Sequence, residues 1–379
     1  MSAAALATDG RPAAGEPGEV RGPVITGWSA VSPYGIGREA FLEGARTGRA
    51  TVAKLDTEQW DGGPDELACL VPGFSAREVL GKKGTRSMDR VTGLAVATVR
   101  ELLRDELGED GPYTADEGAA LVLGTTTGSA QSMMDLTRDT WVNEKPFYID
   151  PSQFPNTVMN CAAGQCAIWY GLKGPNTTVA AGRASGLLAL NYARRLLNSG
   201  RATTVLCGAV EEYSTARSWL EWHTRRPDEG ATVLGEGCAV LRLDHPHTTT
   251  HTPLAELITV TSAVVGPHGI TPSLTQLITN TLNRTGLTPN DIWALSPSTP
   301  AGTAGDHERH ALNHVFHHHT PHRIPAPGPI GDTAAATATF QIITLLTHAH
   351  HNPAPPGRIA LITAVDRDGV LACALLRLL

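Results

Sequence analysis

The sequence predicts an α/β protein in which strands and helices alternate along the chain. Short apolar runs rich in Val, Ile and Leu alternate with segments whose apolar residues recur at helical spacing. Each apolar run ends in Gly, Ser or Thr, which is typical of buried strands that leave a sheet into a loop. The order of these elements is similar in the first and second halves of the chain. We therefore expect two related α/β halves.

The first half begins with PVITGWSAVSP, a branched run that leads into a loop of small residues. Later runs such as AALVLG and TTVLC have the same character, and each is followed by a small-residue loop. The strands expected in this half are residues 23–33, 119–124, 203–207 and 238–243. The helices expected in this half are residues 38–48, 89–107, 129–143 and 185–198.

The second half repeats this order. IWALSPSTPAG corresponds to the earlier LGTTTGSAQS, and GPIGDTAAATATFQIITLL is followed by a closing pair of apolar runs. The strands expected here are residues 257–265, 292–295, 359–364 and 371–376, and the helices are residues 274–284, 306–316 and 333–347. The repetition favours an internal duplication.

Composition excludes several classes of protein. The chain of 379 residues is 41% hydrophobic, yet it has no apolar run of the roughly 18 residues that a membrane span needs. Six scattered cysteines without CxxC pairs suit a reducing cytoplasm. The net charge of -7 gives no attraction for nucleic acid or anionic membrane. Residues 1–22, rich in Ala, Gly, Pro and Glu, are expected to form a disordered tail.

The most informative segment is GPNTTVAAGRASG at residues 174–186. It has the pattern of a strand, a tight turn and a helix of small residues, and such a turn suits a cysteine nucleophile. Backbone N–H groups at the helix start lower the pKa of a thiol placed there. Here the turn holds Arg183, whose guanidinium has no lone pair to attack an acyl group.

The same segments resemble the β-ketoacyl synthases, the condensing enzymes of fatty-acid and polyketide assembly. The resemblance includes VITGWSAVSPYGIG, RSMDRVTGLAVATVRELL, the nucleophile-like turn and LGEGCAVLRLD, and extends over nearly all of the chain from Pro23. It implies the thiolase fold, in which two duplicated α/β halves form five layers, αβαβα. The halves would comprise residues 23–250 and 251–379, with the active site between them.

The family's catalytic positions are changed throughout. Arg183 stands at the cysteine, Pro297 at one histidine, Pro327 at the lysine and Asp332 at the second histidine. Thr299 keeps the threonine of the histidine turn, whereas Val365 and Arg367 replace the phenylalanines of the glycine-rich gate. Proline has no N–H to donate and an ionised Asp332 would repel an oxyanion, so condensation chemistry is not expected. Ser185 is the nearest hydroxyl, but in the family this serine faces helix packing.

A relative with this loss is the chain length factor of type II polyketide synthases. The resemblance then implies a subunit that is non-catalytic alone, forms a heterodimer with a catalytic ketosynthase, and shapes the tunnel for an acyl chain on the phosphopantetheine arm of acyl carrier protein. An independent enzyme with a remodelled pocket is the alternative. It would act on carrier-protein thioesters as a decarboxylase, acyltransferase or hydrolase. A structural homodimer is a third possibility.

Three residues are expected to line that tunnel. The family's length-setting positions match Ala130, Met133 and Thr137, on the helix expected at residues 129–143. Their side chains are small or flexible and would leave the tunnel open, which favours a long, slender product such as a polyene acyl chain. Ordinary packing at a dimer interface is the alternative role for these residues.

Arg183 also admits two interpretations. It either plugs the vacated pocket by pairing with a carboxylate, for which Asp332 is the natural candidate, or binds an anionic ligand such as the phosphopantetheine arm.

A metal or other cofactor is not expected. His307, His310 and His314 lie at helical spacing and His317, His318, His319 and His322 follow, but neither an HExxH motif nor a cysteine accompanies them. A solvated surface segment explains these histidines better.

Overall fold

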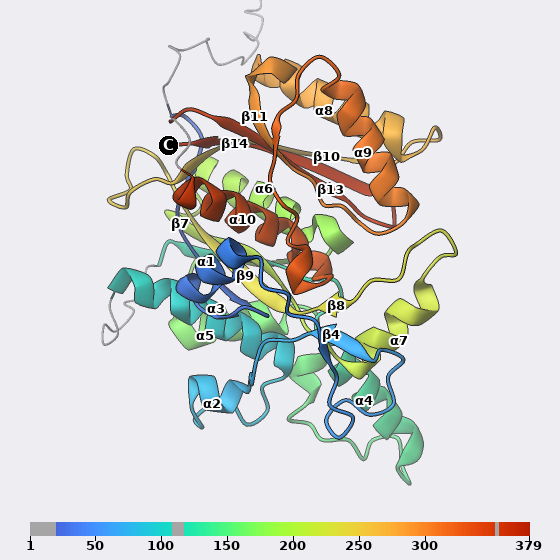
Figure 1. Cartoon of the computed structure of the whole chain (residues 1–379). Helices are drawn as coiled ribbons and strands as arrows, with labels where there is room; N and C mark the ends of the chain where they lie inside the picture. Colours follow the sequence, from blue (N-terminus) through green and yellow to red (C-terminus); the bar gives the residue numbers. More distant parts are fainter. Residues whose placement is uncertain (1–19, 108–116, 353–355) are drawn as a thin grey trace, which may run out of the picture.

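The computed structural model describes residues 20–107, 117–352 and 356–379 (Figure 1). Most of the predicted tail, residues 1–19, lies outside this range. Residues 20–22 differ from the prediction of a disordered segment, because the backbone N–H groups of Arg21 and Gly22 both donate to Glu256 Oε1, at 2.9 Å. The ordered chain therefore starts before Pro23.

Five strands of the first half form one side of a large sheet. They are β1 (Val24–Ser32), β5 (Ala119–Gly124), β6 (Asn176–Val179), β7 (Thr204–Glu211) and β9 (Gly237–Asp244). Their spatial order is β1-β9-β7-β5-β6, with β5 parallel to β6 and β7, and β9 antiparallel to β1 and β7.

Five strands of the second half repeat this order. They are β10 (Ala255–Val264), β11 (Ile292–Ser296), β12 (His322–Arg323), β13 (Ile359–Val365) and β14 (Val370–Leu378). Their order is β10-β14-β13-β11-β12, and every parallel or antiparallel pairing matches its counterpart in the first half. The two sets meet where β1 pairs with β10. The predicted duplication of the fold is confirmed.

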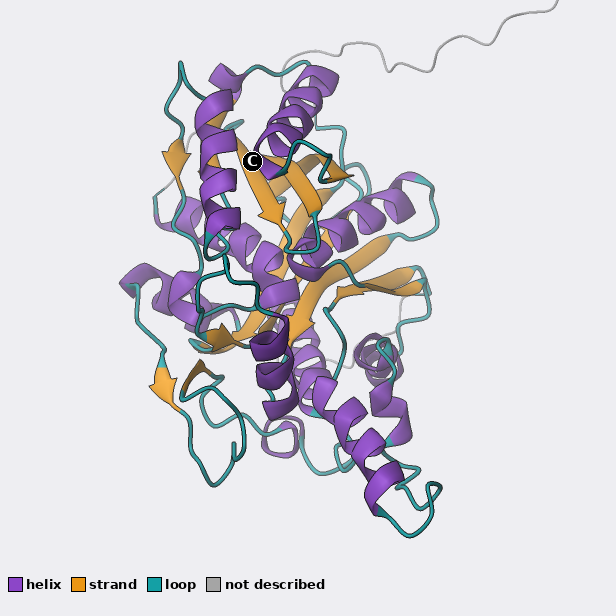
Figure 2. Cartoon of the chain, turned by 90° about the vertical axis from the view of Figure 1, so that its right-hand side faces the viewer, coloured by secondary structure: helices purple, strands orange, loops and turns teal. Residues whose placement is uncertain are grey.

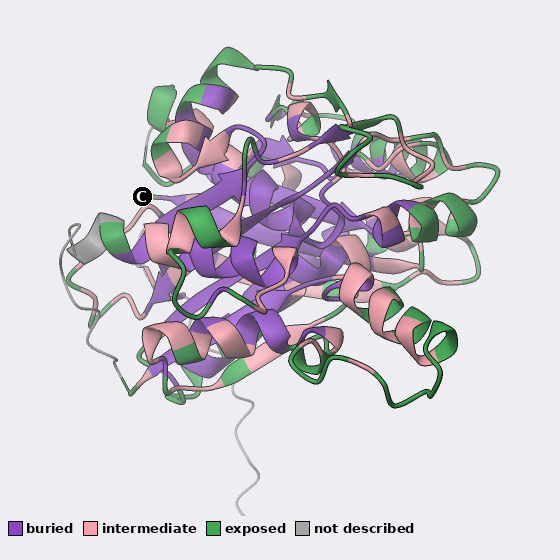
Figure 3. Cartoon of the chain, turned by 90° about the horizontal axis from the view of Figure 1, so that it is seen from below, coloured by how far each residue is buried: buried purple, intermediate pink, exposed green. Residues whose placement is uncertain are grey.

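The helices complete a five-layer arrangement (Figure 2). The central helices α6 (Ser185–Asn198) and α10 (Thr337–His351) pack against each other between the two sets of strands. Against the outer face of the first set lie α3 (Arg90–Leu107) and α5 (Cys161–Tyr170), and α8 (Ile270–Thr285) and α9 (Thr303–Val315) cover the second set. The long inner strands of the sheet and the two central helices are mostly buried (Figure 3), whereas the edge strands β6 and β12 are partly or fully exposed.

Smaller elements surround these layers. They are β2 (Gly35–Ile36), α1 (Arg38–Thr47), β3 (Ala53–Lys54), β4 (Leu67–Cys69), α2 (Ala76–Leu80), α4 (Ala130–Val142), α7 (Thr215–Thr224) and β8 (Leu234–Gly235). The sequence did not predict α5, whose apolar residues lie all round the helix, or α7. The last central helix was predicted to begin at residue 333, but a 3₁₀ turn, η5 (Ala334–Ala336), precedes α10.

A glycine allows the two central helices to approach closely. A Cβ on Gly186 of α6 would lie 2.6 Å from Thr339 Oγ1 of α10, so only glycine fits there. The close approach brings the first turns of α6 and α10 to one place in the molecule. That place is where the candidate site lies.

A buried carboxylate connects several segments of the first half of the chain. Glu236, between β8 and β9, is 0% exposed and accepts from Arg90 Nε at 2.6 Å and Arg90 Nη2 at 2.5 Å. It also accepts from the backbone N–H groups of Val71, at 2.8 Å, and Tyr213, at 3.1 Å. One side chain thus connects α3, the end of β7 and the loop after β4.

Replacing Glu236 by alanine should strongly destabilise the chain, because it leaves the Arg90 guanidinium, which is only 18% exposed, without its counter-charge. A loss of about 3–5 kcal/mol in the free energy of unfolding is expected, measured by urea unfolding. The control is Glu43→Ala, which removes the exposed Glu43–Arg46 pair and should change little. Equal effects of the two changes would contradict this role.

Candidate functional site

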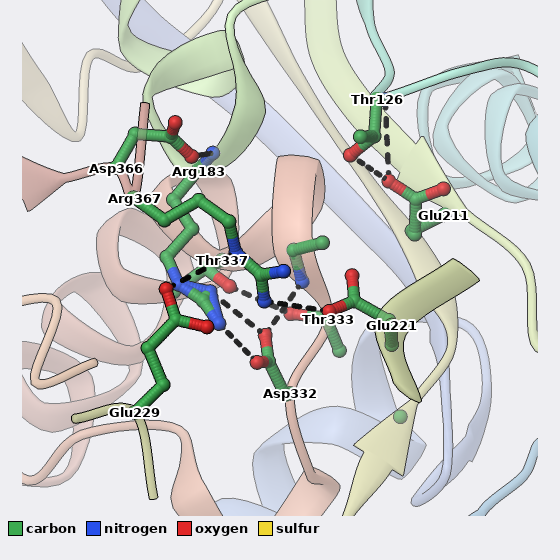
Figure 4. Close-up of polar contacts among 12 residues, drawn as sticks. Thr126, Arg183, Glu211, Glu221, Glu229, Asp332, Thr333, Thr337, Asp366 and Arg367 are labelled. Carbon is green, nitrogen blue, oxygen red and sulfur yellow. Dashed lines mark hydrogen bonds and ion pairs between the residues drawn. The ribbon is translucent and has the colours of Figure 1, made fainter. Parts of the chain in front are cut away.

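The site lies where the first turns of α6 and α10 meet. The 3₁₀ turn η2 (Gly182–Ala184) precedes α6, as η5 precedes α10, and the two turns are in contact. The loops after β11 and β13 reach the same place, because parallel strands end at one edge of their sheet. Figure 4 shows the charged side chains that converge there.

Arg183 and Asp332 form an ion pair at the centre of the site. Arg183 Nη1 donates to Asp332 Oδ1 at 3.3 Å, and Nη2 forms a second, short contact with Oδ2. The two side chains are only 13% and 12% exposed. The structure therefore brings together the residues at the former cysteine and second histidine, in the two-pronged geometry that arginine and carboxylate favour.

Asp332 is held rigidly from its main chain. Asp332 N donates to Val233 O and Gly235 N donates to Asp332 O, both at 2.9 Å, while buried Arg217 donates to Asp332 O at 2.9 Å. Burial works to raise the pKa of Asp332, but the guanidinium groups of Arg183 and Arg217 outweigh it and hold the pKa below its ordinary value. The carboxylate is thus ionised at neutral pH.

Arg367 binds two carboxylates of the first half of the chain. Its guanidinium donates to Glu221 of α7 at 2.6 Å and lies 3.7 Å from Glu229, in the loop after α7. This connects the turn after β13 to the first half of the chain (Figure 4). Arg367 is thus committed to internal partners.

The backbone of the nucleophile turn is also occupied. Arg183 N donates to Asp366 Oδ1 at 2.8 Å, and Val365 N donates to Ser298 Oγ at 3.1 Å. The side chain of Val365, predicted to line the pocket, instead lies fully buried in the core with Leu361 and Leu371. Val365 ends β13 with its side chain on the face that packs against α8 and α9, away from the central helices, and it is not among the residues that line the cavity beside the ion pair.

The loop after β11 holds Pro297 and Thr299, which were predicted at the family's histidine and threonine positions. Pro297 is buried, and Glu308 of α9 accepts from Ser298 N at 3.0 Å and Thr299 N at 2.7 Å. These bonds hold Thr299 at φ 45, an unfavourable backbone conformation for this residue. Burial raises the pKa of Glu308, although hydrogen bonds from Thr363 and Ser298 oppose the shift.

A cavity of about 300 Å³ remains beside the ion pair. Arg183, Thr299, Pro327 and Asp332 line it. Its volume is at the lower end of the range of ligand pockets, about 300–1,000 Å³. Its walls offer two prolines and an ion pair, with neither a thiol nor an imidazole among the described lining residues. The hydroxyl groups that line the cavity belong to Thr232, Ser298, Thr299 and Thr337, and no imidazole among the described lining residues stands beside them to act as a base.

The predicted tunnel residues lie elsewhere, on α4. Ala130 is buried in the first turn of this helix, whereas Met133 and Thr137 are exposed on its surface. None of these three is among the lining residues of the five main cavities in the described part of the chain.

The histidine-rich segment forms no metal centre in the described residues, where no group of three or more His, Cys, Asp or Glu is arranged to hold an ion. No helix in the described ranges is long and apolar enough to span a membrane.

Sequence reasoning missed three partners in this site. Asp366 lies between Val365 and Arg367, two positions that the sequence analysis assigned to the pocket. An acidic residue in a segment where the family has a glycine-rich gate could have indicated its role. Glu221 and Glu229 carry no local pattern, because they become partners only through the packing of α7 and its following loop.

Comparison with known proteins identifies the family. Residues 23–246 match the model of the β-ketoacyl synthase N-terminal domain. A solved structure, described as the ishigamide ketosynthase/chain length factor, is 42% identical, with a TM-score of 0.87 over 94% of this chain and 99% of that one. The chain belongs to the β-ketoacyl synthase family and has the thiolase fold.

Two sequence relatives show how far the similarity extends. A putative polyketide β-ketoacyl synthase 2 of Streptomyces halstedii is 27% identical over 93% of this chain and 91% of its own length. The 3-oxoacyl-[acyl-carrier-protein] synthase 2 of Synechocystis is 28% identical, but the match covers 58% of this chain and 57% of the relative. The match to the Synechocystis protein therefore spans little more than half of either chain.

Arg183→Ala should destabilise the chain by about 3–5 kcal/mol at pH 7, because Asp332 is then buried without its main counter-charge. The Arg183–Asp332 pair stabilises the native chain fully above the pKa of Asp332 in the unfolded chain, which is about 3.9. This stabilisation is lost as the pH falls through the pKa of Asp332 in the native chain, which is lower. The difference between the two proteins, measured by urea unfolding across pH, should therefore shrink on acidification.

The control for this pair is Arg183→Ala combined with Asp332→Asn. The double variant should be less destabilised than Arg183→Ala alone, since no buried charge is left unpaired. Purely additive effects, or a deficit that stays constant to low pH, would count against the ion pair.

Proposed function

We propose that this chain is a non-catalytic chain length factor, which pairs with a cysteine-bearing ketosynthase and shapes the tunnel for an acyl chain on acyl carrier protein. The observation that carries the proposal is the Arg183–Asp332 ion pair, which stands where the nucleophile and a catalytic histidine would have to be. The similarity over 94% of the chain to the ishigamide ketosynthase/chain length factor supports it.

An exposed apolar surface supports the need for a partner. It comprises Met133, Met134, Trp141, Val142, Phe147, Tyr148, Phe154, Val158, Met159 and Ile168, on α4, α5 and the segment between them. We call it the α4–α5 surface. Contiguous apolar patches of this kind mark interaction sites in soluble proteins.

One of the two edges of the large sheet, β6, lies beside the α4–α5 surface, and the other edge is β12. Among the described strands, β6 pairs only with β5, and α5 packs next to it. An unpaired edge strand can accept a strand from another chain, whose backbone groups then complete its hydrogen bonding. A ketosynthase of the same fold has a corresponding strand to offer, so we assign this face to the ketosynthase partner.

The α4 helix places the length-setting residues at this same face. Ala130 begins the helix, and Met133 and Thr137 follow on its surface, within or next to the α4–α5 surface. A partner seated there would cover them and close a tunnel between the two chains. Their small or flexible side chains would leave such a tunnel long.

The proposed heterodimer can be tested by co-expression with the catalytic ketosynthase and measurement of the mass of the complex. A one-to-one complex is expected, and Ile168→Glu should disrupt it, because a charge would be buried at the interface. Ile168 is 76% exposed in the single chain. Val264→Glu is the matched control, since Val264 is 74% exposed but lies on β10 of the other half.

A homodimer that ignores the ketosynthase, or equal effects of both substitutions, would overturn the proposed interface. Turnover of a carrier-protein thioester by the purified chain alone would instead favour an independent enzyme with a remodelled pocket.

Ala130→Phe in the complex should shorten the product, because an aromatic ring would fill the start of the tunnel. Product length is measured by mass spectrometry of the released acyl chains. Asp139→Phe is the control, since nine residues further on an α-helix points to the opposite face. An unchanged length with Ala130→Phe would contradict a gate at this position.

A further inference from the structure

Asp366 contacts the nucleophile turn in a way that the lost catalytic residues do not explain. Its side chain is 5% exposed, and Oδ1 accepts from Arg183 N at 2.8 Å. The carboxylate lies so close to the turn that a Cβ on Gly182, at φ 53, would be 1.9 Å from Oδ1. The second oxygen, Oδ2, accepts from Asp368 N at 2.9 Å. Asp366 is therefore fixed against the turn.

The N–H group that Asp366 occupies has a special position. It belongs to the residue at the former nucleophile, one turn before the 14-residue helix α6. Backbone N–H groups at such places stabilise anions, whether a thiolate or the oxyanion of a reacting carbonyl. The N–H of Val365, at the neighbouring gate, donates to Ser298 Oγ and is not free either.

We propose that the nucleophile turn is a carboxylate-binding site whose ligand is the chain's own Asp366. The carboxylate of Asp366 occupies the place where a small carboxylate ligand, or the oxyanion of an acyl thioester, would otherwise bind. The chain then carries a second barrier to condensation besides the missing cysteine. This inference goes beyond the proposed function, because it holds with or without a partner subunit.

The two barriers are structurally separate. The guanidinium of Arg183 pairs with Asp332, whereas only the backbone of Arg183 meets Asp366. Changing the Arg183 side chain therefore leaves the carboxylate of Asp366 in place. A cysteine introduced at this position would meet a negative charge and an N–H already in use, and both raise a thiol pKa.

The test uses a cysteine at position 183 as a reporter. Arg183→Cys is combined with Asp332→Asn, so that no buried carboxylate is left without its arginine, and alkylation by iodoacetamide is followed at pH 7. The thiolate sulfur forms the new bond to carbon, iodide leaves, and the thiol proton goes to solvent. Peptide mass spectrometry measures residue 183 alone, and the six native cysteines are buried.

Adding Asp366→Ala should accelerate alkylation about tenfold, since a fall of one unit in the pKa of a thiol gives about ten times more thiolate. Asp366→Asn removes only the negative charge, because asparagine has nearly the same shape as aspartate, so this variant should also accelerate alkylation. It provides the test if the alanine variant does not fold. The matched control is Asp368→Asn, whose side chain is 79% exposed on the same turn. It should leave the rate unchanged.

The ligand class is tested by chemical rescue with formate. Formate should raise the thermal midpoint of the Asp366→Ala chain above that in chloride at equal ionic strength, because it can take the vacated place on Arg183 N. The parent chain should show no such difference. Equal alkylation with and without Asp366, an equal effect of Asp368→Asn, or no preference for formate over chloride would each overturn the proposal.

Discussion

The meeting of two helix starts determines the rest of this molecule. The duplicated halves each contribute a central helix, and the contact at Gly186 and Thr339 brings the first turns of α6 and α10 together. Loops from both sets of strands end at the same place, so residues that are far apart in the sequence share one small volume. In a condensing enzyme this geometry assembles a catalytic centre. Here the same geometry assembles charged side chains that bind to internal partners.

Charged and polar groups at this place have partners within the chain. Arg183 is balanced by Asp332, Arg367 by Glu221 and Glu229, and the N–H of the nucleophile turn by Asp366. A buried charge is costly unless it is paired and hydrogen-bonded. The Arg183–Asp332 pair and the contacts of Arg367 with Glu221 and Glu229 are therefore units in which the loss of one member leaves its own partner without a counter-charge.

Much of the fold was predictable, because branched apolar runs and helical spacing are local properties of the sequence. The strand at residues 119–124 was predicted with its observed bounds for this reason. The family resemblance also indicated that Arg183 could reach Asp332. The contacts of Glu221 and Glu229 could not be predicted, since they depend on the side-chain packing of distant segments. Val365 was misplaced because a gate residue was expected where the strand continues.

The free edge of β6 has a consequence for how the chain must be produced. An edge strand that is paired on one side only and lies beside exposed apolar side chains can pair with a similar edge strand of another molecule, including a second copy of this chain. A cell that makes the chain in excess of a complementary subunit would thus risk self-association and precipitation. If the proposed heterodimer forms, balanced synthesis of its two subunits would be a requirement of solubility before it is a requirement of chemistry.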